Sequence, residues 1–236
     1  MSAAFGLNVV RLGTIDYEVA LQLQNSLLVA RMGDAIEDTL LLLEHTHTYT
    51  LGRGADERFI IHPPPDMPIH RVSRGGQVTY HGPGQLIGYP IFKLEGSERD
   101  LSRYLRKLEQ VLINALERCG IAAGRREKLT GVWVANEKIA SIGVGIRRWV
   151  TQHGFAINIA TDLSYFDRIV PCGIEGCRMT SIAALGHREV SLNDFGGIVE
   201  EETAVVFGHS DRHQVDPQDL WRLVEVPGEA VATANP

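Results

Sequence analysis

Hydrophobic residues recur at helical spacing in three parts of the chain. The clearest part runs from Leu101 to Cys119, where apolar side chains form one stripe and a glycine follows at a position typical of a helix end. The same period spans Asp16 to Met32, with Thr14 as the expected N-cap. A third helix is expected from Ser191 or Asn193 to Phe207. The pattern therefore predicts three helices separated by long stretches of another kind.

Between these helices, apolar runs are short and are bounded by turn residues. Four consecutive leucines lie between Asp38 and His45, which is typical of a strand buried on both faces. Further strands are expected at Gln85–Phe92, Gly131–Ala135, Lys138–Ile146 and Val150–Ile159. The last three follow one another closely, which indicates an antiparallel meander. The mixture predicts an α/β or α+β fold with one main sheet.

Composition narrows the class of protein. The chain has 236 residues, 44% of them apolar, which suits one large domain over residues 1–216 and a partly loose tail over 217–236. A net charge of −6 argues against a protein that wraps nucleic acid or coats an anionic membrane. No membrane-spanning apolar run and no signal peptide are evident. Three cysteines do not make a disulfide framework, so a cytoplasmic location is expected.

A glycine-rich segment is the densest group of candidate ligand-binding residues. Its members are Arg74, Gly75, Gly76, Gln77, Val78, Thr79, Tyr80, His81, Gly82, Pro83, Gly84 and Gln85. The glycines let the backbone approach a ligand closely, and the polar side chains among them supply hydrogen-bond donors. A turn that leads into a strand explains the same glycines without any ligand. The segment matches neither a Walker loop nor a dinucleotide fingerprint.

Cys172 is the candidate nucleophile. It lies between Pro171 and Gly173 in an expected loop, where backbone N–H groups can face an oxyanion. A small buried hydrophobic residue is the alternative, and it is the expected role of Cys119. His45 and His47 match no known zinc spacing, so no metal and no cofactor are expected.

Lys138 opens an otherwise apolar strand and is the candidate partner of this cysteine. A lysine in this position is often a surface residue at a sheet end. If it points inward beside a thiol, lowering the thiol pKa from about 8.5 by two units requires roughly 2.7 kcal/mol. One ammonium about 4 Å away offers about 4 kcal/mol at an effective dielectric near 20. A single lysine would therefore suffice to activate the thiol.

These segments, in this order, resemble the lipoyl(octanoyl) transferase family. The pattern R-G-G-x-x-T-[aromatic]-H-x-x-[G/H]-Q-x-x-x-Y is matched from Arg74 to Tyr89, and K-I-A-x-I-G from Lys138 to Gly143. The H-G-F-A-x-N and D-L-x-x-F-x-x-I-x-P-C-G-I patterns match His153–Asn158 and Asp162–Ile174. The resemblance spans roughly residues 8 to 208, and its combination of motifs is highly specific. The chain departs from the family pattern at His45–Thr48, where prolines are usual, and at Cys177.

The resemblance implies acyl transfer through a covalent thioester. An octanoyl group would pass from acyl carrier protein to Cys172, and then to a lysine on a lipoyl domain of a 2-oxo acid dehydrogenase or of the glycine-cleavage H protein. Lys138 matches the family lysine that lowers the cysteine pKa. Further matched residues line the family's acyl pocket: Arg74 to His81, Ser141, Ile142, Gly143, Gly154, Phe155 and Ala156. The implied fold is that of biotin and lipoate protein ligases, a mixed main sheet with flanking helices and a smaller sheet.

Two other functions remain open on the sequence. An ATP-dependent lipoate or biotin ligase would share the fold but would need no cysteine nucleophile. A non-catalytic module that binds lipoyl domains could keep the pocket glycines but would need neither Cys172 nor Lys138. Two arginine pairs, Arg125–Arg126 and Arg147–Arg148, are candidate docking sites for acidic carrier domains, with solvated turns as the alternative.

Overall fold

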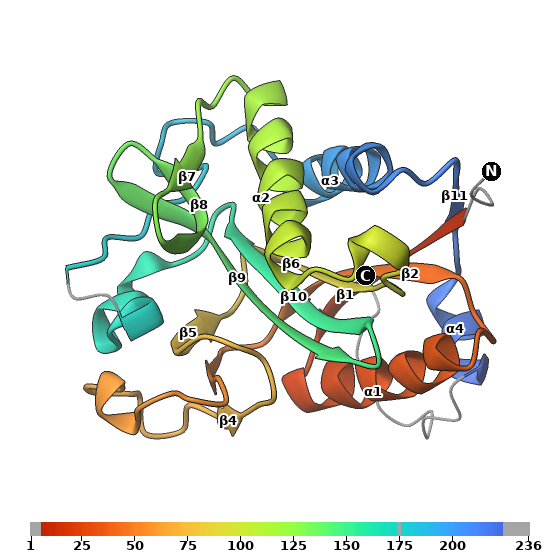
Figure 1. The fold of residues 1–236 in the computed structure, drawn as a ribbon. Coiled ribbons are helices and arrows are strands. Elements are labelled where there is room, and N and C mark those ends of the chain that lie inside the picture. Colours follow the sequence, from red (N-terminus) through yellow and green to blue (C-terminus); the bar gives the residue numbers. More distant parts are fainter. Residues whose placement is uncertain (1–5, 174–175, 224–236) are drawn as a thin grey trace.

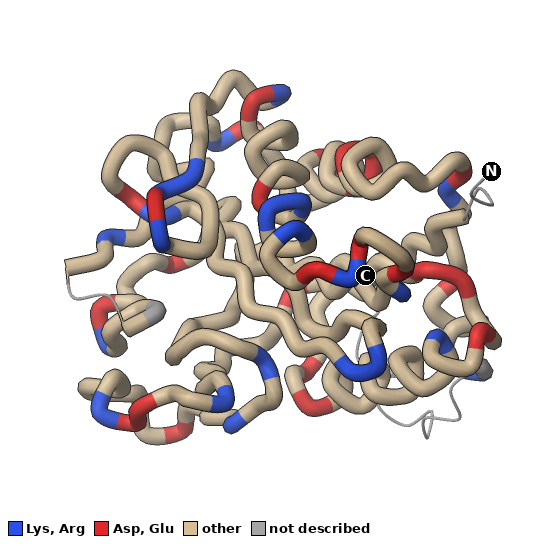
Figure 2. The backbone as a smooth tube through the Cα atoms, viewed as in Figure 1, with Lys and Arg blue, Asp and Glu red and all other residues tan. Residues whose placement is uncertain are grey.

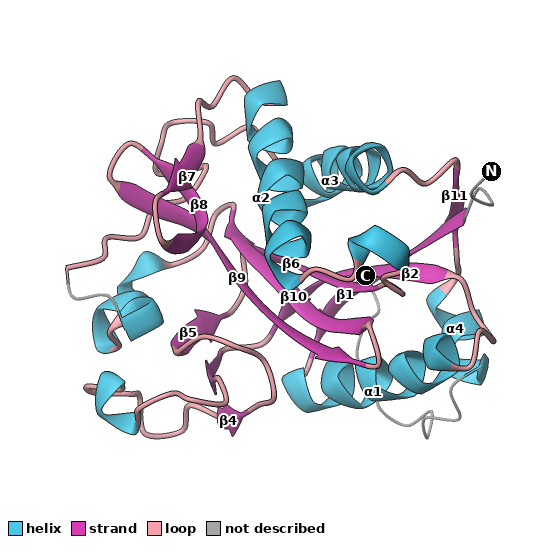
Figure 3. Cartoon of the chain, viewed as in Figure 1, coloured by secondary structure: helices cyan, strands magenta, loops and turns pink. Residues whose placement is uncertain are grey.

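A mixed sheet forms the centre of the molecule, as a computed structural model shows for residues 6–173 and 176–223 (Figures 1 and 3). Within these residues the main sheet has eight strands in the order β11-β1-β2-β6-β10-β9-β8-β7, and a small sheet has the order β4-β3-β5. The strands of the main sheet are β1 (Gly6–Ile15), β2 (Asp38–His45), β6 (Gln85–Ile91), β7 (Gly124–Arg126), β8 (Leu129–Val134), β9 (Glu137–Arg147), β10 (Val150–Asn158) and β11 (Asp211–Gln214). Those of the small sheet are β3 (Thr48–Leu51), β4 (Ile69–Arg71) and β5 (Val78–His81).

Helices cover both faces of the main sheet. They are α1 (Tyr17–Met32), α2 (Leu101–Arg118), α3 (Leu192–Phe207) and the short α4 (Pro217–Leu223), and the 3-10 turns are η1 (Glu57–Phe59), η2 (Gly96–Glu98), η3 (Leu163–Arg168) and η4 (Pro171–Gly173). Helices α2 and α3 lie on one face, and α1 lies on the other (Figure 1). The predicted fold class, a mixed main sheet with flanking helices and a smaller sheet, is confirmed.

The run of four leucines in β2 explains how the two helical layers share one sheet. Leu40 and Leu42 belong to the core beneath α2 and α3, whereas Leu41 and Leu43 belong to the core beneath α1. Successive side chains of a strand point to opposite faces, so a continuous apolar run is required where both faces are buried. The prediction for this strand is confirmed.

The predicted helices are confirmed with small changes at their ends. Thr14 is not the cap of α1, because it lies within β1; the side chain of Asp16 accepts a 2.8 Å hydrogen bond from the amide of Glu18 instead. The first part of the tail forms α4, and Leu220 of this helix is buried in the core beneath α1. Residues 224–236 lie outside the described part of the chain. No helix in the described residues is long and apolar enough to cross a membrane.

Candidate active site

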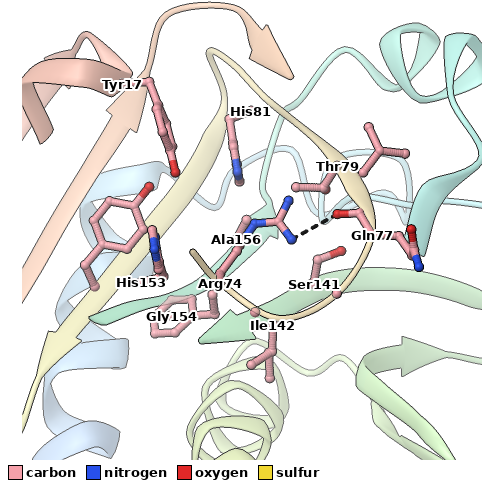
Figure 4. A pocket seen from close by; sticks show the side chains of 15 residues that line it. Tyr17, Arg74, Gln77, Thr79, His81, Ser141, Ile142, His153, Gly154 and Ala156 are labelled. Carbon is pink, nitrogen blue, oxygen red and sulfur yellow. Dashed lines mark hydrogen bonds between the residues drawn. The ribbon is translucent and has the colours of Figure 1, made fainter. Parts of the chain in front are cut away.

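A pocket opens where the glycine-rich segment meets the β9–β10 hairpin (Figure 4). It holds about 470 Å³ of empty space, including the part open to solvent. The lining residues are Tyr17, Arg74, Gly76, Gln77, Val78, Thr79, His81, Tyr89, Ser141, Ile142, Gly143, His153, Gly154, Phe155 and Ala156. Five segments that are distant in sequence therefore converge on one space.

Arg74 holds the glycine-rich segment in shape. Its side chain is buried, and Nη1 donates 3.0 Å hydrogen bonds to the carbonyls of Gly75 and Gln77. Its Nη2 donates to the carbonyl and the hydroxyl of Thr50 on β3, at 2.8 and 2.7 Å. The Gly75 amide donates to the carbonyl of Val144 at 2.9 Å, which ties the segment to β9. Arg74 thus both lines the pocket and supports its wall (Figure 4).

His81 and His153 line the pocket and His45 lies beside His81, and burial keeps all three imidazoles neutral at pH 7. Burial lowers the pKa of His45 to about 4. The same cause, with a smaller contribution from the Arg74 charge, lowers the pKa of His153 to about 4. The pKa of His81 lies well below its usual value, first because of burial and then because of nearby His45. Uncharged imidazoles can accept or donate hydrogen bonds with defined tautomers.

Two tyrosines contact these histidines. The Tyr89 hydroxyl donates a 2.7 Å hydrogen bond to Nε2 of His45, whose Nδ1 donates to the carbonyl of Ile15 at 3.0 Å. The Tyr17 ring stacks on His81 with ring centroids 6.1 Å apart. Burial raises the pKa of Tyr17 to about 12, and burial also raises the pKa of Tyr89 well above its usual value. Both hydroxyls therefore stay protonated near neutral pH.

The wall formed by β10 depends on small residues. A Cβ at Gly154 would lie 2.2 Å from the carbonyl oxygen of Gly88 on β6, so only glycine allows this approach. His153 before it has φ +59, which is rare for a residue with a side chain, and its amide donates to Gln24 of α1 at 2.8 Å. Such local strain is often found at functional sites.

Lys138 lies near the start of β9 and is 1% exposed, so the surface alternative is wrong. Its Nζ lies 5.7 Å from the centre of the Trp133 ring. Its backbone is paired with the segment after the 172 turn: its amide donates to the carbonyl of Arg178 at 2.8 Å, and its carbonyl accepts from the amide of Thr180 at 2.9 Å. The buried lysine is therefore held by the segment that follows the predicted nucleophile in the chain.

Cys172 lies in turn η4, but its side chain is outside what the structure describes. The next residue, Gly173, has its backbone against the glycine-rich segment, because a Cβ there would lie 3.0 Å from Cγ of Gln77. Gln77 lines the pocket. The backbone of the 172 turn thus lies beside the pocket rather than on another face of the molecule.

Most of the sequence-predicted pocket residues line this one space. Gly75 and Tyr80 do not: the Gly75 amide is bound to β9, and the Tyr80 hydroxyl hydrogen-bonds Nδ1 of His47 at 2.7 Å within the small sheet. Sequence reasoning missed Tyr17, Tyr89 and His153 as lining residues. The last two stand in the quoted motifs and could have been found there, whereas Tyr17 reads as one position of a helical stripe.

The remaining candidates, Cys119, His45 and His47, have contacts that explain them as parts of the folded structure. Cys119 packs against the main core, as expected, and burial raises the pKa of its thiol. His45 and His47 hydrogen-bond tyrosines. Among the described residues, no group of three or more His, Cys, Asp or Glu side chains is arranged to hold a metal ion.

Comparisons with known proteins assign the family. Residues 16–204 match the family model described as lipoyl protein ligase A/B catalytic domain. An octanoyltransferase of Solibacter usitatus (strain Ellin6076) is 50% identical over 202 residues, covering 84% of this chain and 91% of that protein. An octanoyltransferase of Caldicellulosiruptor saccharolyticus is 41% identical over 230 residues, covering 94% and 97%.

Solved structures agree on the fold. A bi-partite lipoate protein ligase from Thermoplasma acidophilum superposes with a TM-score of 0.68 at 16% identity, covering 94% of this chain and 91% of that one. At this identity the likeness shows the fold alone. The matched family model and the curated relatives lead to one conclusion. The chain belongs to the lipoyl protein ligase A/B catalytic-domain family, and the relatives it matches there are octanoyltransferases.

Proposed function

We propose that this octanoyltransferase moves an octanoyl group from acyl carrier protein to a lysine of a lipoyl domain, through a thioester on Cys172. One observation carries the proposal. The buried Lys138 is paired through its backbone with the segment that follows the 172 turn, and Gly173 of that turn lies against Gln77 of the pocket wall. Thiol activation requires an amine close to the cysteine, and this backbone pairing supports such an arrangement of Lys138 and Cys172.

The first half-reaction forms the thioester. Lys138, in its neutral form, takes the proton of the Cys172 thiol, and the thiolate attacks the carbonyl carbon of the octanoyl thioester carried by acyl carrier protein. The bond between this carbon and the donor sulfur breaks as the bond to Cys172 forms. The departing donor thiolate takes the proton back from Lys138.

The second half-reaction forms the amide. The ε-amine of the acceptor lysine attacks the same carbonyl carbon, and Lys138 accepts the proton that the amine loses. The Cys172 sulfur leaves with that proton, so the enzyme returns to its starting state. Lipoyl domains of 2-oxo acid dehydrogenases and the glycine-cleavage H protein are the proposed acceptors.

The apolar part of the pocket is the proposed site of the acyl chain. Val78, Ile142, Phe155 and Ala156 line it together with glycines. Burying one methylene stabilises a bound chain by about 0.8 kcal/mol. This increment is small, so a pocket of fixed depth selects acyl-chain length only coarsely. It does not sharply reject an acyl chain that is one methylene longer or shorter.

Arg147 and Arg148 are the proposed docking residues for acidic carrier domains. Both are exposed at the tip of the β9–β10 hairpin (Figure 2), whose other end lines the pocket. The other arginine pair is less suitable, because Arg125 binds the buried carboxylate of Glu109 at 2.8 Å and the Arg126 guanidinium stacks 4.5 Å from a tryptophan ring. The proposed setting is the cytoplasm, where free thiols such as Cys119 persist.

Intact-mass measurement after incubation with octanoyl-acyl carrier protein tests the proposal. We expect an added octanoyl group that is lost in Cys172→Ser and kept in the matched control Cys177→Ser. Loss in Cys177→Ser with retention in Cys172→Ser would refute the assignment of the nucleophile. No adduct in the unmodified chain, with binding of lipoyl domains intact, would support a non-catalytic module, and product from ATP and free octanoate alone would support a ligase.

A further inference from the structure

A continuous series of buried hydrogen bonds, here called the chain, leads from Arg74 to the segment that pairs with the backbone of Lys138. Its members, in order, are Arg74, Thr50, His81, Gln85, Asn158 and the carbonyl of Thr180. The five bonds measure 2.7, 3.3, 2.9, 2.9 and 2.9 Å. Each member is buried, with 7% exposure or less. The bonds join the small sheet, β6, β10 and the segment after the 172 turn.

The two ends of this chain fix the direction of every bond in it. The guanidinium of Arg74 can only donate, so the hydroxyl of Thr50 accepts from it. Burial lowers the pKa of His81 well below its usual value, so only one of its two ring nitrogens carries a hydrogen. A backbone carbonyl, at the other end, can only accept.

The middle of the chain follows from these ends. Asn158 must use its amide nitrogen to donate to the Thr180 carbonyl, so its Oδ1 accepts from Nε2 of Gln85. Oε1 of Gln85 then accepts from Nδ1–H of His81, which leaves Nε2 of His81 to accept from the Thr50 hydroxyl. Donors and acceptors match at all five bonds in one direction only. A protonated His81 would reverse the bond to Thr50, because its Nε2–H would then donate to the hydroxyl oxygen.

The chain ends on the residue that holds the Lys138 backbone. The Thr180 amide donates to the Lys138 carbonyl at 2.9 Å, while the Thr180 carbonyl is the last acceptor of the chain. The Asn158 backbone carbonyl also accepts from the amide of Ile182 at 3.0 Å. Asn158 therefore binds the 180–182 segment twice and fixes its distance from β10.

We propose that this chain positions Lys138 relative to the 172 turn, and that Gln85 and Asn158 are positioning residues for acyl transfer. The proposal rests on the proposed function of Lys138 and Cys172. Neither Gln85 nor Asn158 lines the pocket, so their effect reaches the reaction only through the segment that they hold. Misplacing a catalytic group by about 1 Å can cost about 100-fold in rate.

Two variants break the chain at different strands while keeping side-chain volume. Asn158→Leu removes the bonds to Gln85 and Thr180 from β10, and Gln85→Met removes the bonds on either side of β6. Each is expected to lower kcat about 10- to 100-fold with little change in KM for the acyl donor. The kcat of the double variant is expected to be little lower than that of either single variant, because both substitutions interrupt the same series of hydrogen bonds.

The pH dependence of Cys172 alkylation separates positioning from loss of stability. It is measured in a protein that also carries Cys119→Ser and Cys177→Ser, so that Cys172 is the one thiol that can be alkylated. A lysine that is less well placed lowers the thiol pKa less, so the midpoint should rise by about one unit in both variants. Gln152→Leu is the matched control, since it removes the 2.7 Å amide bond between Gln152 and Asn25 from the same strand. It should leave both kcat and the midpoint unchanged.

Folded variants with the kcat and alkylation midpoint of the unmodified protein would overturn the proposal. An effect of equal size in Gln152→Leu would also overturn the proposal, because loss of any buried amide in this strand would then have the same effect on activity. Should both chain variants fail to fold, Thr50→Val breaks the chain one link earlier with a side chain of equal shape, and the same shifts are expected. Failure of the unmodified protein to form any Cys172 adduct would instead overturn the proposed function itself.

Discussion

Gly131 lies directly against the side chain of Lys138. A Cβ at Gly131 would be 2.6 Å from Cε of Lys138 and 3.2 Å from its Nζ, and Gly131 has φ +132. The amide of Gly131 donates to the buried carboxylate of Glu109 at 3.1 Å, so β8 cannot easily move away. The space that the lysine occupies therefore depends on the absence of a side chain on the neighbouring strand.

Replacing this glycine tests that relationship. Gly131→Ala should lower the rate of thioester formation at least about 10-fold, because the lysine must move and small displacements of catalytic groups are costly. It should also lower the free energy of unfolding by about 1 kcal/mol or more, since φ +132 is unfavourable for alanine. Single-turnover acylation and urea unfolding measure the two effects. Gly124→Ala on β7, where nothing lies within 4 Å, is the control for acylation.

The apolar pocket wall can be tested by filling it. Ala156→Leu adds three carbon atoms to a residue that lines the pocket. We expect the rate with an octanoyl donor to fall about 10-fold or more relative to a butanoyl donor, since each excluded methylene loses about 0.8 kcal/mol. Competition between the two donors gives the ratio directly. An unchanged ratio in a folded variant would place the acyl chain elsewhere.

The buried His45 makes stability depend on pH. Burial lowers its pKa in the folded state to about 4, against about 6.5 when unfolded. Between these values the unfolded chain binds more protons, so the contribution of the neutral imidazole is complete above about pH 6.5 and is lost as pH falls towards 4.

Urea unfolding at several pH values measures this contribution. The free energy of unfolding should fall between pH 6.5 and 4.5, and His45→Gln should make the slope shallower. His153, with a pKa near 4, contributes in the same direction and keeps the slope from vanishing. A slope unchanged by His45→Gln would show that this imidazole is not the group that titrates.

Charge at the β9–β10 hairpin tip should affect encounter with the donor more than chemistry. Arg147→Glu with Arg148→Glu is expected to raise KM for octanoyl-acyl carrier protein several-fold and to flatten its salt dependence, while kcat stays similar. Arg58→Glu is a control, because Arg58 is exposed but belongs to turn η1 and pairs with Asp56. Unchanged salt dependence in the hairpin variant would remove the docking assignment.

Local patterns predicted much of the fold because they depend on neighbours in sequence. The apolar stripe of α2 and the four leucines of β2 each indicate which faces of these elements are buried. Strands β1 and β11 were not predicted, since β1 pairs in parallel with partners distant in sequence and β11 is exposed throughout. Such pairing is decided by tertiary contacts and leaves a weak local pattern.

The sequence by itself determined where the candidate residues stand along the chain: the glycine-rich segment, Lys138 and Cys172 lie in recognisable motifs. Only the tertiary structure decided how they are arranged. It buried Lys138 against Gly131 and brought Tyr17 of α1 to the pocket. It also aligned Gln85 with Asn158 across two strands. Burial and hydrogen-bond direction depend on packing between segments far apart in the chain, and spacing along one segment does not encode them.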